Sequence, residues 1–104
     1  MRPVIAYITT KDEAEAKKIG RDLLEKRLAA CVNIFASMQS MYWWEGKINE
    51  SKEAVLLAKT DSSKVDALIE AVKKSHSYTV PCVLTFPVEK GNPDYIRWLE
   101  QSLK

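Results

Sequence analysis

The fold is decided by residues 30–60, ACVNIFASMQSMYWWEGKINESKEAVLLAKT. This stretch holds two long runs typical of β-strands, residues 30–44 and 47–60, separated by the dipeptide Glu45-Gly46. Because glycine supplies the backbone freedom that a tight turn needs, the stretch is predicted to form one β-hairpin.

The predicted hairpin is too long for the body that carries it. A compact chain of 104 residues has a radius of gyration of roughly 13 Å, so a diameter of about 33 Å. A strand from Cys31 to Trp44 extends on the order of 46 Å, so it must bend near residues 36–40 or project. The projecting part would expose Met38, Met41, Tyr42, Trp43 and Trp44. We expect a second copy of the chain to cover this surface, the alternative being a hairpin folded back on its own helix.

The segments before the hairpin predict a strand and a helix. Residues 4–9 are apolar on both faces, as in a central strand. Residues 11–28 repeat apolar side chains at helical spacing, and Thr10 with Glu13 predicts a capping box at the start of that helix.

The segments after the hairpin predict a helix, an edge strand and a last helix. Val65 begins a one-faced apolar pattern that ends at Lys74. Residues 82–88 are bracketed by proline, which cannot donate to a central ladder, so this strand is expected at an edge. Asn92, followed by proline, is a typical start for the last helix.

The resulting order, β-α-β-β-α-β plus a helix, predicts an α+β fold. The expected architecture is a ferredoxin-like βαββαβ sandwich with an extended β-hairpin and an extra C-terminal helix, in a single domain over residues 1–104. Right-handed crossovers give the strand order 4-1-3-2. Cys31 and Cys82 would then lie at opposite edges, which excludes a disulfide between them.

Composition narrows the functional classes. Sixteen basic and fourteen acidic side chains are intermixed along the chain, so no basic patch for nucleic acid is indicated. No apolar run approaches the length of a membrane span, and no secretion signal is visible, so a cytoplasmic location without membrane contact is expected. An RNA-recognition module, which has the same element order, would need aromatic residues in the third strand, and EAVLLAKT (53–60) has none.

His76, Glu53 and Lys59 are the leading candidates for a ligand site. His76, the only histidine, is either a metal ligand or proton-transfer group facing a cleft, or a hydrogen-bonded loop residue at a helix end. Glu53 and Lys59 share strand parity and so one sheet face, where they would serve a cleft or form interface salt links. No nucleophile–base pair is visible, so no enzymatic activity is expected.

The aromatic and sulfur side chains have alternative interpretations as well. The aromatic set would stack nucleobases or pack an interface, and the lack of interleaved basic residues favours the interface; its members are Tyr42, Trp43, Trp44, Tyr95 and Trp98. The two cysteines are most simply buried thiols. As ligands of copper(I), together with His76 and Met38 or Met41, the cysteines would need partners from other subunits.

Five segments together give the chain a family resemblance. They are AACVNI (29–34), SMYWWEGK (40–47), EAVLLAKT (53–60), HSYTVP (76–81) and DYIRWL (94–99). In this combination and spacing the chain resembles the CutA divalent-cation tolerance family over essentially its whole length.

The resemblance implies a homotrimer, similar in shape to the PII signalling proteins, with clefts between subunits. The cleft positions that match are Tyr42, Trp44, Glu53, Lys59, Tyr78, Tyr95 and Trp98, and His76 matches as the metal position. No cofactor is required, and a divalent cation such as copper, or a small molecule, is the implied ligand. Bacterial members can carry a cysteine and a second histidine where this chain has Ile8 and Ser75. The alternative function is a PII-like signalling module that binds a small anionic metabolite.

Overall fold

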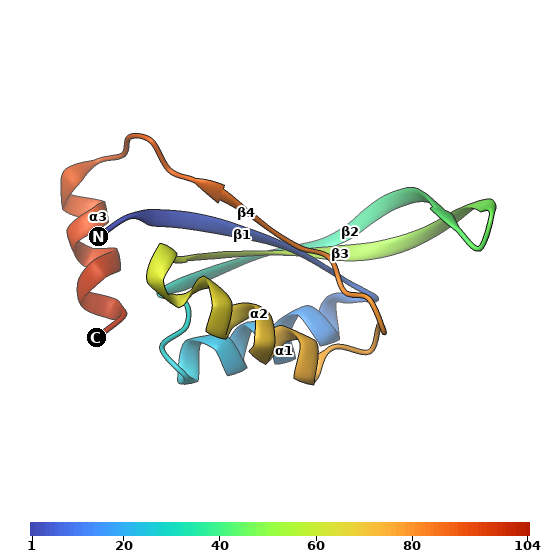
Figure 1. The fold of residues 1–104 in the computed structure, drawn as a ribbon, viewed down its shortest axis with the longest axis horizontal. Helices are drawn as coiled ribbons and strands as arrows, with labels where there is room; N and C mark the ends of the chain where they lie inside the picture. The colour runs from blue at the N-terminus through green and yellow to red at the C-terminus, as the bar shows by residue number, and fades with distance from the viewer.

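The computed structural model describes residues 1–104 as a four-stranded antiparallel sheet with two helices on one face and a third at one end (Figure 1). The elements are β1 (Pro3–Thr10), α1 (Glu13–Glu25), β2 (Cys31–Trp44), β3 (Lys47–Asp61), the 3-10 turn η1 (Ser62–Lys64), α2 (Val65–Ser75), β4 (Val83–Pro87) and α3 (Pro93–Ser102). The sheet order is β2-β3-β1-β4, which confirms the predicted α+β class and strand order. Both cysteines are free thiols, as expected from that order, but each is partly exposed, so the prediction that they are buried is wrong.

Helix α1 begins later than predicted because β1 is longer. Thr10 still pairs with Ala54 in the sheet, so it cannot cap the helix. The N-cap is Asp12, whose carboxylate accepts a hydrogen bond from the Glu15 amide at 2.8 Å. The predicted capping box of Thr10 and Glu13 is therefore wrong. The helix also ends at Glu25, ahead of the predicted end at residue 28.

The β2–β3 hairpin both bends and projects. Glu45 and Gly46 have φ values of 50° and 77°, so the predicted two-residue turn is confirmed. A register shift between Phe35 and Met38 leaves two residues of β2 unpaired and bends the strand. The bend lies where it was predicted from the length of the strand, near residues 36–40. The tip nevertheless extends well beyond the helices (Figure 1), and the molecule measures 45 × 25 × 22 Å.

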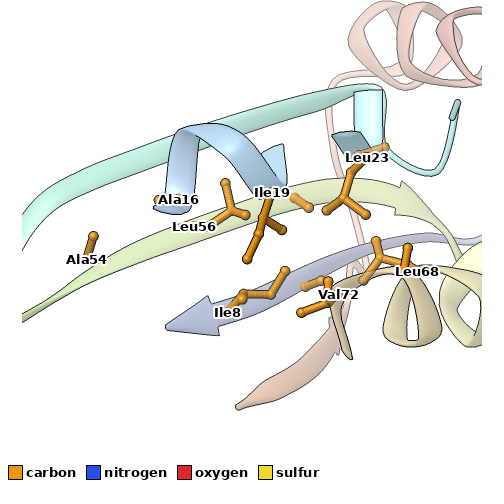
Figure 2. Packing of buried hydrophobic residues seen from close by; sticks show 12 residues of the cluster. Ile8, Ala16, Ile19, Leu23, Ala54, Leu56, Leu68 and Val72 are labelled. Carbon is orange, nitrogen blue, oxygen red and sulfur yellow. The ribbon is translucent and has the colours of Figure 1, made fainter. Parts of the chain in front are cut away.

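The core lies between the sheet and the helices α1 and α2 (Figure 2). Its central side chains are fully buried and come from both layers: Ile8, Leu56, Ile19, Leu23, Leu68 and Val72. Small residues on the same sheet face, Ala6, Ala54 and Ala58, let the helices approach closely. None of the helices has the length and apolar character needed to span a bilayer.

The opposite face of the sheet has no helix layer over it. Register places Phe35 opposite Val55 on this side, and Phe86 opposite Ile5. Phe35, Leu84 and Phe86 are each more than half exposed, at 59%, 58% and 53%. We call this surface the open face. An apolar sheet face of this kind favours contact with another protein surface.

Candidate functional site

The predicted cleft residues form two separate groups within one chain. Glu53 and Tyr78 meet below the hairpin, close to Tyr42 and Trp44, whereas Lys59 lies at the other end of β3. Strand parity does place Glu53 and Lys59 on the same, open side of the sheet. Six residues of strand nevertheless separate them by roughly 20 Å. The two side chains therefore cannot act together on one small ligand within a single chain.

The first group is centred on a buried carboxylate. Glu53 is only 8% exposed, and the Tyr78 hydroxyl donates a hydrogen bond of 2.8 Å to its Oε2. Burial and this hydrogen bond to Glu53 raise the pKa of Tyr78 far above its usual value. Tyr78 is therefore a neutral hydrogen-bond donor that orients the carboxylate.

His76 is held behind Tyr78 by two hydrogen bonds. Its Nδ1 accepts from the Tyr78 amide at 3.0 Å, so Nε2 carries the proton and donates to the Thr9 carbonyl at 2.7 Å. The side chain is fully buried, and its ring lies 4.7 Å from that of Tyr78. His76 also caps the C-terminus of α2, donating its amide to the Val72 carbonyl. Of the two interpretations of His76 made from the sequence, this arrangement agrees with the second, a hydrogen-bonded residue at a helix end.

Glu15 is a residue of this region that was not anticipated from the sequence. Its carboxylate accepts hydrogen bonds from the amides of Lys11 at 3.0 Å and Ser77 at 2.8 Å, and it lies 3.9 Å from His76 Nδ1. Burial by itself would raise the pKa of Glu15, but the hydrogen bonds from Lys11 and Ser77 outweigh it and lower the pKa. Glu15 thus ties the loop that carries Tyr78 to the start of α1.

The second group joins β3 to the last helix. Lys59 donates a hydrogen bond of 3.1 Å to the Tyr95 hydroxyl, and its Nζ lies 5.2 Å from the centre of that ring. The hydrogen bond to Tyr95 raises the pKa of Lys59. Trp98 packs beside Tyr95 with ring centres 5.4 Å apart. Tyr95 and Trp98 are 40% and 48% exposed, so they present an aromatic surface at this end of the sheet.

An open cavity of about 720 Å³ lies between the hairpin and the loop after α2. Its lining includes four of the predicted residues, Tyr42, Trp44, Glu53 and Tyr78. It also includes side chains that were not proposed for the cleft: Tyr7, Thr9, Met38, Met41 and Cys82 are among them. We call it the Glu53 cavity. A volume of this size suits a small organic molecule.

The chain alone does not present a divalent-metal site. Both ring nitrogens of His76 are occupied by hydrogen bonds, so neither has a lone pair free for a metal. No group of three or more histidine, cysteine, aspartate and glutamate side chains is placed to hold an ion. The role of His76 as a metal ligand therefore stays a prediction that this geometry does not support.

Known proteins resemble this chain over almost its full length. The mouse protein named Protein CutA is 48% identical over 96 residues, which cover 92% of this chain and 54% of the mouse protein. The chain therefore spans about half the length of that vertebrate relative. The divalent-cation tolerance protein CutA of Archaeoglobus fulgidus is 43% identical and is covered over 95% of its length.

Solved structures agree with the fold described above. The structure of the periplasmic divalent cation tolerance protein CutA from Archaeoglobus fulgidus superposes with a TM-score of 0.95, at 41% identity, over 98% of this chain and 99% of that one. CutA1 from Oryza sativa gives a TM-score of 0.95 at 39% identity, over 98% and 94% of the two chains. The family model described as CutA1 divalent ion tolerance protein matches residues 4–102. With the strand order, the hairpin and the sequence all in agreement, this chain belongs to the CutA1 divalent ion tolerance protein family.

Proposed function

We propose that the protein acts as a non-enzymatic homotrimer of the divalent-cation tolerance type, with ligand sites at clefts between its subunits. The observation that carries the proposal is the combination of the open face with the projecting hairpin. Trp43, Met41 and Ile48 near the hairpin tip are 73%, 67% and 60% exposed, in addition to the phenylalanines of the open face. So much exposed apolar surface favours burial against further copies of the same chain.

Assembly would also protect the sheet edges. β2 and β4 are the outer strands, and the outer edge of β2 runs the length of the hairpin. An unpaired edge of this length favours pairing with a neighbouring strand. The number of copies, three, is the number that the family resemblance implies. The cytoplasmic location expected from the sequence stays a prediction.

Light scattering tests the assembly. We expect a mass three times that of the 11.8 kDa chain. Phe86→Asp, on the open face of β4, is expected to shift the mass toward one chain, because it would bury a charge in the interface. Thr85→Asp is the matched control: Thr85 is exposed on the same strand but points to the other side of the sheet. A wild-type mass of one chain, or equal effects of both variants, would contradict the proposal.

A divalent cation such as copper is a candidate ligand of these clefts, with donor atoms supplied by more than one copy of the chain. Calorimetric titration of copper(II) into the wild type and His76→Ala tests the role of His76. Because both ring nitrogens are hydrogen-bonded, we expect the two proteins to bind copper with equal affinity. A clear loss of binding in His76→Ala would instead assign the metal to this residue. Gln101→Ala, at an exposed position of α3 outside the cavity, is a control for nonspecific effects.

A further inference from the structure

The charge of the Glu53 cavity is distinctive. Of its thirteen lining residues, Glu53 is the only one with an ionisable group that is charged near neutral pH. Burial, with the nearby charge of Glu53, raises the pKa of the Cys82 thiol, and the pKa of Tyr78 is raised as well. Both groups are therefore neutral. The cavity wall carries one negative charge and no positive one.

Glu53 has no cationic partner within the chain. The ion pairs of the structure join Lys26 to Asp22, Lys73 to Glu70 and Arg97 to Asp94, and none of them involves Glu53. A carboxylate that is removed from water without a counter-charge is costly, and one hydrogen bond from a neutral hydroxyl compensates only part of this cost. The carboxylate is thus set up to receive a positively charged group.

The cavity walls suit a cation attached to an apolar body. Four aromatic side chains line the cavity: Tyr7, Tyr42, Trp44 and Tyr78. Two of them are held in place, since Tyr42 hydrogen-bonds to Ser51 at 3.2 Å and the Tyr7 hydroxyl lies 3.6 Å from the Met38 sulfur. Aromatic faces attract cations and also pack against hydrocarbon.

We propose that the Glu53 cavity binds a small primary ammonium ion carried on an apolar chain or ring. The ammonium N–H groups would donate to Glu53 and to the Ser40 hydroxyl, which also lines the cavity. The apolar body would lie against the aromatic walls and the methionines. An anionic metabolite has no positive group to bind here, so the PII-like alternative finds no support at this cavity. The inference rests on the proposed ligand-binding function of the cleft, but it needs only residues of one chain.

Three probes of similar size and different charge test the inference by calorimetry at pH 7. Phenethylamine is a cation, 2-phenylethanol is its neutral counterpart, and phenylacetate is an anion. We expect phenethylamine to bind at least about 10-fold more tightly than either of the others, because an ion pair with a buried carboxylate is worth more than about 1.4 kcal/mol. The N-trimethylated amine should also bind more weakly than phenethylamine, since it has no N–H to donate.

Two glutamate variants provide the matched comparison. Glu53→Gln keeps an acceptor for the Tyr78 hydroxyl, so we expect it to fold and to lose at least about 10-fold in affinity for phenethylamine. Glu50→Gln changes the same charge on the same strand at an exposed position outside the cavity, and should bind as the wild type does. Trp44→Leu should also weaken binding, through loss of the aromatic face.

Several results would overturn the inference. These are equal binding of the alcohol and the amine, tighter binding of phenylacetate, unchanged binding in Glu53→Gln, or no binding of any probe. The mass of the same sample separates this failure from that of the proposed function. If the protein is a trimer and does not bind the amine, the proposed assembly is supported and the ammonium site is ruled out, as expected if a neighbouring copy fills the cavity. If the protein is a single chain and binds the amine, the ammonium site is supported and the trimer is ruled out.

Discussion

Replacing Glu15 by alanine is expected to lower the free energy of unfolding by about 2–4 kcal/mol, because hydrogen bonds to a buried charged group are among the stronger ones. The Glu15 side chain is 6% exposed, and it accepts from the amides of Lys11 and Ser77. Removing the carboxylate leaves both amides without their partner. Chemical denaturation followed by circular dichroism measures the change.

The same carboxylate predicts a dependence on pH. The pKa of Glu15 is lowered in the folded protein from an ordinary value of 4.5. A lowered pKa contributes stability that is complete above the unfolded value and is lost as the pH falls through the folded value. The difference in stability between the wild type and Glu15→Gln should therefore be largest at neutral pH and shrink below about pH 4.5.

The control lies two residues away on the same helix. Glu13 is exposed in the first turn of α1 and accepts no hydrogen bond from the loop. We expect Glu13→Ala to change the free energy of unfolding by no more than about 0.5 kcal/mol, the scale of a surface charge near a helix end. Equal effects of the two substitutions, or a difference that does not vary with pH, would contradict the role given to Glu15.

The hairpin shows what local sequence can predict. The dipeptide Glu45-Gly46 specifies a tight turn by itself, and the length of the two runs requires a bend, found at the register shift after Phe35. The start of α1 is harder to predict from the sequence, because Thr10 and Asp12 are both good N-cap residues. Only the pairing of Thr10 with Ala54 decides between them, and that contact is distant in the sequence.

The candidate site shows what could not be predicted from the sequence. Strand parity correctly placed Glu53 and Lys59 on one face of the sheet. It could not predict that Glu53 contacts Tyr78 and that Lys59 contacts Tyr95, because both tyrosines come from later segments of the chain. Glu15 did leave a signal: it precedes Ile19 by one helical repeat, so it occupies a core-facing position of α1. An acidic residue in an apolar stripe indicates a buried polar contact.

Leu56→Ala is expected to lower the free energy of unfolding by about 2–5 kcal/mol, the range for truncating a buried leucine. Leu56 is fully buried between β3 and the two helices (Figure 2). Leu57→Ala is the natural comparison, because the next side chain is partly exposed on the open face. It should cost less in the isolated chain. Its effect should depend on protein concentration if further copies cover that face.

A second substitution, at Gly20, tests whether helix α1 packs directly on the Leu56 side chain. A Cβ atom added at Gly20 would lie 3.3 Å from Leu56 Cδ1 and 3.1 Å from Val32 Cγ2, so helix α1 rests almost directly on these side chains. Gly20→Ala is crowded in the wild type, whereas in Leu56→Ala part of the crowding is gone. We therefore expect a favourable coupling of roughly 0.5–2 kcal/mol in a double-mutant cycle, the scale for residues in contact. Strict additivity would mean that Val32 alone sets the close approach of α1, and that the helix does not rest on Leu56.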